Sequence, residues 1–155
     1  MIQRIQSVYL LITALLSVLF LNGPILSFSD DANTTYSVRL AALQKIGPAG
    51  GSEIIASLIT PVIVILLIII TSLVAIFLFR NRKLQMKFAA ALICLSVLLI
   101  LVIIWYMYEI STEFNAALNF RLNLILPLLM LISSVLAFSG IRKDEKLVRS
   151  YERLR

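Results

Sequence analysis

The stretch Arg80-Asn81-Arg82-Lys83-Leu84-Gln85-Met86-Lys87 decides how the rest of this chain is interpreted. It holds four basic residues and is the only dense charge cluster between the two ends of the chain. Apolar runs flank it, at 61–79 on one side and 88–108 on the other. Each run has about the length, ~20 residues, that crosses the hydrocarbon core of a bilayer as a helix. The stretch is therefore predicted to connect two transmembrane helices.

The composition also indicates a membrane protein. The chain has 155 residues, 61% of them hydrophobic and only 14% charged, and its mean hydropathy is +1.01. A soluble domain carries about 25% charged residues, so most of this surface is expected to face lipid. One membrane domain, 1–155, is the natural division. The net charge of +6 is read as a topology signal that also attracts anionic headgroups, and nucleic-acid binding is not expected.

We expect an all-α membrane protein whose four transmembrane helices form two hairpins. The predicted helices span residues 7–28, 53–79, 87–109 and 119–140. The first begins after a positive end, as a signal peptide does, but lacks an Ala-x-Ala site and is predicted to stay uncleaved. Trp105, Tyr106 and Tyr108 favour the headgroup level and mark the outer boundary of the third helix.

Two segments outside the predicted helices carry weaker patterns. The polar segment 29–52 is predicted to be an outer loop. Within it Tyr36, Val38 and Leu40 alternate with polar residues, which favours a short strand, and two helical turns at 39–46 are the alternative. The tail 141–155 places apolar residues on one helical face, which predicts a short amphipathic helix lying at the membrane surface.

The distribution of basic residues predicts the orientation. Eleven Lys or Arg residues lie in the first residues, the central connection and the tail, against three (Arg39, Lys45 and Arg121) in the outer segments. Because loops rich in Lys and Arg resist translocation, both termini and the central connection are predicted to be cytoplasmic.

The residues offer no catalytic or metal constellation, and no catalytic residue, cofactor or metal is predicted. Histidine is absent, and the single cysteine, Cys94, lies within an apolar run. The Ser and Thr residues of the spans are expected to bond to their own helix backbone. Glu109, Glu113 and Arg121 are predicted to form a local charge network at the outer rim, fixing the third helix against the fourth rather than binding a substrate.

Residues of the central connection and the tail form one basic cytoplasmic face, which is predicted to contact lipid headgroups or a protein partner. The residues assigned to it are Arg80, Asn81, Arg82, Lys83, Lys87, Arg142, Lys143, Asp144, Lys146, Arg149 and Arg153.

Three segments resemble a known family: 1–11, beginning Met-Ile-Gln-Arg-Ile-Gln; 79–85, containing Arg-Asn-Arg-Lys-Leu-Gln; and 141–155, containing Lys-Asp-Glu-Lys-Leu-Val-Arg-Ser and ending Arg-Leu-Arg. The chain resembles a family of small four-helix membrane proteins of Bacteroidota that is described as a domain of unknown function. The resemblance implies four helices in a bacterial inner membrane and brings no activity with it. Because topology alone does not require Gln3, Asn81, Gln85 or Asp144, these residues are predicted to meet one another or a defined partner.

The sequence leaves three function classes to compare. We favour a non-enzymatic inner-membrane subunit or assembly factor of a larger complex, such as protein export or envelope-biogenesis machinery, with a membrane-protein partner. The alternative is a small oligomeric transporter or channel, and a membrane enzyme or lipid-binding protein comes third. The oligomeric state and any substrate do not follow from the sequence.

Overall fold

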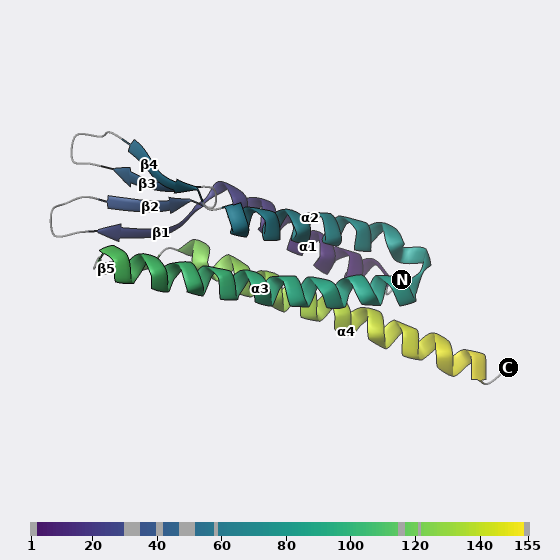
Figure 1. Cartoon of the computed structure of the whole chain (residues 1–155). Coiled ribbons are helices and arrows are strands. Elements are labelled where there is room, and N and C mark those ends of the chain that lie inside the picture. The colour runs from purple at the N-terminus through teal and green to yellow at the C-terminus, as the bar shows by residue number, and fades with distance from the viewer. Residues whose placement is uncertain are drawn as a thin grey trace.

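The computed structural model describes the backbone of residues 3–29, 35–39, 42–46, 52–57, 59–114, 117–120 and 122–153, and the side chains of residues 5–23, 59–79, 81–109, 112 and 123–147. Four long helices form a bundle, and a five-stranded sheet lies at one end of it (Figure 1). The long helices are α1 (Gln3–Asn22), α2 (Ile59–Phe77), α3 (Arg82–Phe114) and α4 (Ile125–Arg153). Short 3-10 turns, η1 (Leu78–Arg80) and η2 (Leu122–Leu124), precede α3 and α4.

Each of the four helices contains a stretch long and apolar enough to cross a membrane, which makes this a multi-pass membrane protein. Each packs against two neighbours: α1 against α2 and α4, and α3 against α2 and α4. The four spans therefore form a closed ring, in which no pair stands apart as a hairpin. The start of α1 and the α2–α3 connection lie at one end of the bundle, called here the basic end, and the sheet lies at the other (Figure 1). Helix α4 passes through the basic end, and its last turns project beyond the other helices (Figure 1).

The sheet is the main departure from the predicted all-α fold. Its strands are β1 (Pro24–Ser29), β2 (Thr35–Arg39), β3 (Ala42–Ile46), β4 (Ser52–Ser57) and β5 (Ala117–Phe120). They pair antiparallel in the order β4-β3-β2-β1-β5. The strand predicted around Tyr36 and Val38 is confirmed as β2, whereas the helical alternative at 39–46 is wrong because β3 lies there. The sheet joins the connection before α2 to the connection before α4.

Two predicted helix ends are wrong because strands of the sheet, β1 and β4, occupy the residues assigned to them. The predicted first helix continues to residue 28, but α1 ends at Asn22 and β1 follows; the predicted second helix begins at 53, within β4. Pro24 disfavours helical backbone in the residue before it, and Asn22 Nδ2 donates to the Val18 carbonyl at 3.0 Å in the last turn of α1. The mainly apolar residues 25–28, which were assigned to the membrane helix, suit a strand equally well.

The other helix boundaries also differ from those predicted. Pro61 and Pro127 fall in the first turns of α2 and α4, where a helix does not need the missing amide donor. Helix α3 is longer than predicted at both ends, since it begins at Arg82 and continues to Phe114.

The predicted separate tail helix is instead part of α4, which continues through Gly140 to Arg153 without a break. An added Cβ at Gly140 would lie 3.0 Å from Gln6 Cγ, so this glycine permits close approach of α1 and α4 rather than ending the helix. The amphipathic face proposed for the tail includes residues whose side chains lie outside those described.

The interior of the ring combines large apolar side chains, such as Phe20 and Leu99, with small and polar ones, while its outer surface is almost entirely aliphatic. Ala75, Ala89, Ala137, Thr13 and Ser72 are buried. The outward positions of all four helices carry exposed Leu, Ile and Val side chains instead. Such a surface suits lipid, and small interior residues let the helix backbones approach closely.

Ala75 provides the test of this packing. It is fully buried on α2, so Ala75→Leu is expected to destabilise the bundle by about 1–3 kcal/mol through overpacking. Ala91 on α3 is exposed, so Ala91→Leu makes the same change toward lipid and should be neutral. Thermal unfolding of the two variants in a mild detergent checks this, and equal stability of the two would contradict the assigned interior.

Candidate interaction site at the basic end

Hydroxyl groups join α1 to α4 at the middle of the bundle. Thr13 and Ser133 share a hydrogen bond with their Oγ atoms 2.8 Å apart, and Ser17 donates to Met130 Sδ at 3.6 Å. Thr13 and Ser17 also donate to carbonyls of their own helix, those of Tyr9 and Thr13, at 3.0 and 2.7 Å. The prediction that these hydroxyls serve only their own helix is therefore wrong for this pair of helices.

A second hydroxyl contact joins α2 to α1, since Ser72 donates to the Leu10 carbonyl at 2.6 Å. Ser96 and Ser134 behave as predicted and donate to carbonyls of their own helices, each at 2.8 Å. Among the side chains that the structure describes, no buried nitrogen or oxygen lacks a hydrogen-bond partner. The interior hydroxyls are thus used in packing the helices.

The first polar contact of the basic end joins the two terminal helices. Gln6 of α1 donates from Nε2 to Asp144 Oδ2 of α4 at 2.5 Å. Both side chains are buried, at 5% and 8% exposure, although Asp144 lies in a run of charged residues. Because a carboxylate accepts a stronger hydrogen bond than a neutral oxygen does, this contact is expected to hold α1 firmly against α4.

The α2–α3 connection is fixed by two amide side chains. Gln85, 4% exposed, donates from Nε2 to the Ala75 carbonyl at 3.1 Å and so joins α3 to α2. Asn81 precedes α3 and its Oδ1 accepts from the Leu84 amide at 3.5 Å, in the position of a helix N-cap. These contacts give Asn81 and Gln85 internal roles in the turn between the helices.

A small cavity lies where these helix ends meet. Its lining residues come from α1, from the α2–α3 connection and from α4: Gln6, Ser7, Phe79, Arg82, Gln85, Ile141 and Asp144. Its volume, about 10 Å³, is at the lower limit for a single water molecule. The cavity therefore marks the centre of a tight polar junction rather than a substrate site.

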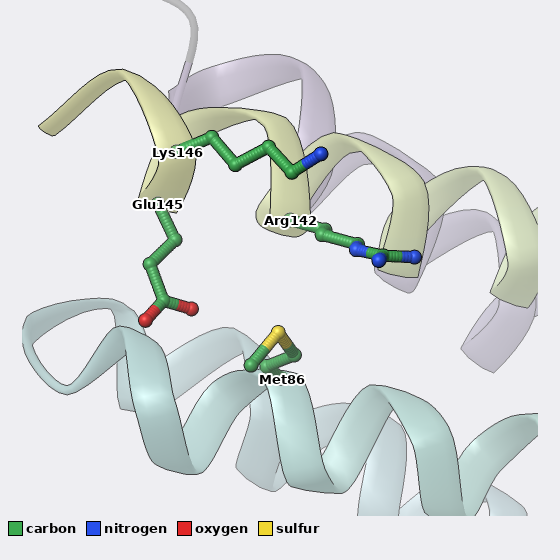
Figure 2. Close-up of a pocket in the computed structure, with 4 residues that line it drawn as sticks. All are labelled: Met86, Arg142, Glu145 and Lys146. Atoms are coloured by element: carbon green, nitrogen blue, oxygen red, sulfur yellow. The ribbon is translucent and has the colours of Figure 1, made fainter. Parts of the chain in front are cut away.

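A larger and more open cavity lies between α3 and α4 beside this junction. It has a volume of about 260 Å³ and is lined by Met86, Arg142, Glu145 and Lys146. In Figure 2 the Glu145 side chain extends from α4 toward α3, and the Met86 side chain extends from α3 toward α4. The Arg142 and Lys146 side chains run alongside α4. Two cations and one carboxylate thus border one cavity at the basic end.

Comparison with known proteins identifies the family. The family model described as "Domain of unknown function (DUF4293)" matches residues 2–154. The chain belongs to this family. A search of curated proteins found no match to it. The family covers nearly the whole of the chain, so the bundle, the sheet and the basic end together make up the DUF4293 domain.

The residues of the predicted basic face of this DUF4293 chain differ in exposure. Lys83, Lys87, Arg142, Lys143 and Lys146 are exposed at the basic end. Asp144 is buried, which corrects its assignment to an exposed partner face: its carboxylate accepts from Gln6. Asn81 is exposed and Arg82 is half-buried, while the side chains of Arg80, Arg149 and Arg153 lie outside those described.

Of the residues predicted to meet one another, Gln85 and Asp144 line the same small cavity but bond to other partners, Ala75 and Gln6. Gln6 is the residue that sequence reasoning missed. A polar residue at the start of an apolar helix was the available signal, but its partner lies 138 positions away.

The predicted outer-rim network lies largely outside the described side chains. Glu109 is exposed near the sheet end of α3, whereas the side chains of Glu113 and Arg121 are not among those described. Within the described part of the chain, no group of three or more Asp, Glu, His or Cys residues gathers in a way that could hold a metal ion.

The Gln6–Asp144 contact is testable by substitution. Asp144→Leu removes the acceptor and leaves the buried Gln6 amide without it, which is expected to cost about 1–3 kcal/mol of stability. The double variant Gln6→Leu with Asp144→Leu should recover part of that loss, because both polar partners are then replaced. Thermal unfolding in mild detergent gives the comparison.

The matched control is Lys143→Leu, which makes the same kind of change at the exposed neighbour of Asp144. An Asp144→Leu variant as stable as this control would show that Gln6 and Asp144 are not coupled.

Proposed function

We propose that this DUF4293 protein is a non-enzymatic integral subunit or assembly factor of a larger complex in a bacterial inner membrane. Its partner is a membrane protein, and complexes of protein export or envelope biogenesis are the class we favour. Both termini and the basic end lie on the cytoplasmic side in this proposal. The four helices long and apolar enough to cross a membrane support the membrane bundle, and the DUF4293 family leaves the activity open.

The observation that carries the proposal is the separation of two sets of polar groups. The hydroxyls of the interior are hydrogen-bonded to one another or to helix carbonyls, which makes the ring a packed body. The exposed Lys and Arg side chains of the described helices gather at one end instead. A rigid membrane body with one charged end suits docking, whereas a transport path needs polar groups that face an open interior.

The orientation rests on charge. Lys and Arg residues are retained on the cytoplasmic side of inner-membrane proteins. The basic end holds both described clusters of basic residues, one at the start of α3 and one in α4. The exposed Trp105 and Tyr108 lie on α3 toward the sheet end, at the level where aromatic rings favour the opposite interface. The sheet then lies on the periplasmic side.

Cysteine labelling tests this orientation. In a Cys94→Ala background, Thr112→Cys near the sheet end should react with a membrane-impermeant maleimide once the outer membrane is permeabilised. Lys83→Cys at the basic end should react only after the inner membrane is disrupted. The reverse pattern of labelling would place the basic end on the periplasmic side and contradict the proposal.

Purification at native expression tests the subunit role. The tagged protein, extracted in mild detergent, is expected to bring down a membrane protein in a fixed ratio, measured by mass spectrometry. A variant with Lys83→Gln, Lys87→Gln and Lys143→Gln should lose most of that partner, because three exposed cations of the docking end are removed while Gln6 and Asp144 stay intact.

The matched control changes three exposed residues near the sheet end, with Tyr108→Ala, Glu109→Gln and Thr112→Ala, and should keep the partner. Recovery of the protein alone as a defined oligomer, together with ion or solute flux through proteoliposomes, would contradict the subunit role and favour a transporter or channel.

A further inference from the structure

We propose that the cavity lined by Met86, Arg142, Glu145 and Lys146 binds the phosphate of an anionic phospholipid headgroup, with the acyl chains lying along the outer faces of α3 and α4. This inference goes beyond the proposed subunit role and does not depend on which leaflet the basic end faces. It follows from the depth of the cavity in the membrane, from its charge and from the surface beside it.

The cavity lies at headgroup depth. Met86 is nineteen residues before Trp105 on α3, which corresponds to about 28 Å along the helix. This distance is close to the thickness of the hydrocarbon core, about 30 Å. Trp105 is 70% exposed and, as an aromatic residue at a span end, is expected at one interface. Met86 and the cavity are then placed at the opposite interface, where lipid phosphates lie.

The charge of the cavity favours an anion. Arg142 and Lys146 are exposed one turn apart on α4 and therefore project from the same side of that helix. Helical side chains lean toward the N-terminus of their helix, and in Figure 2 the Arg142 and Lys146 side chains extend along α4 toward its earlier turns. Those turns are the membrane-spanning part of α4, so the two cations lean toward the headgroup layer.

The cavity also has room for a headgroup rather than a water molecule alone. Its volume of about 260 Å³ far exceeds the ~30 Å³ that one water occupies in the liquid. The Met86 side chain gives it an apolar wall on α3 (Figure 2). Guanidinium and ammonium groups beside such a wall bind a phosphate more strongly than they do in open water, because the local dielectric constant is lower.

The surface beside the cavity suits acyl chains. Val135 lies two turns before Arg142 on the same side of α4 and is 44% exposed, and the neighbouring Ile132 is 47% exposed. Val97, three turns after Met86 on α3, is 41% exposed. Together these residues form an aliphatic strip between the headgroup cavity and the middle of the bilayer. A single lipid thus finds a charged site for its phosphate and an apolar surface for its chains.

Glu145 discriminates between classes of headgroup. With Arg142 and Lys146 the lining carries two positive charges and one negative charge, a net positive charge that favours a phosphate with no cationic group attached. A carboxylate has several lone-pair sites, so Glu145 can accept a hydrogen bond from a headgroup hydroxyl, as a glycerol headgroup provides, in addition to its interaction within the protein. We therefore assign the site to an anionic lipid such as phosphatidylglycerol.

The test uses the purified full chain in nanodiscs or detergent, with native mass spectrometry counting bound lipid. Phosphatidylglycerol should remain bound in preference to phosphatidylcholine. The double variant Arg142→Gln with Lys146→Gln should bind phosphatidylglycerol about tenfold or more weakly, since each removed cation takes away a direct charge-assisted contact with the phosphate. The matched control Lys83→Gln with Lys87→Gln removes the same charge from exposed positions of α3 that do not line the cavity, and should stay within about threefold of the unchanged protein.

Three results would overturn the proposal. Equal loss of lipid in the two double variants would show general attraction to the basic end instead of a site. Displacement of the lipid by millimolar inorganic phosphate would show that a free anion occupies the cavity. Loss of binding in Glu145→Gln, with thermal stability unchanged, would assign the site to a headgroup whose ammonium group needs that carboxylate. Retained or tighter phosphatidylglycerol binding in Glu145→Gln is the expected result.

Discussion

No water is present in the hydrocarbon core to hydrogen-bond a side chain, so the polar groups inside this bundle must be satisfied among the helices themselves. The chain meets this constraint with hydroxyl side chains on small residues. Thr13 and Ser133 bond across α1 and α4, and Ser72 reaches the backbone of α1 from α2. These contacts hold the ring closed while its outer surface stays aliphatic. The interior polarity of this protein thus serves packing, and the groups left for recognition lie outside the ring.

Both ends of the ring are closed by contacts between segments distant in sequence. At one end β1 pairs with β2 and β5, so the connection before α2 and the connection before α4 share one sheet. At the basic end Gln6 binds Asp144, and Gln85 binds the backbone of α2. The exposed cations beside this junction are therefore presented by a fixed framework. That arrangement suits the docking of a partner and the ordered binding of a lipid, which are the two roles proposed for it.

The apolar runs predicted where the chain crosses the membrane, because a span of lipid imposes a length and a composition that local sequence reveals. The same apolar runs did not predict where each helix ends and the sheet begins. Residues 25–28 are apolar enough for a helix and for a strand, and the pairing that decides between them joins β1 to β5, about ninety residues away. The basic end was predicted as a cluster of exposed charges. The burial of Asp144 could not be seen there, since a carboxylate among lysines normally stays in water and its partner Gln6 lies at the other end of the chain.

Disulfide formation across the middle of the bundle tests the closed ring most directly. In a Cys94→Ala background, Thr13→Cys combined with Ser133→Cys places two thiols where the Oγ atoms are 2.8 Å apart, within the reach of a disulfide. Mild oxidation in native membranes should give a monomer with an internal, reducible crosslink. Thr13→Cys combined with Ser96→Cys, on helices that are not ring neighbours, should give none. Absence of the internal crosslink in the first pair, or crosslinks only between two copies of the chain, would contradict a ring closed by α1 and α4.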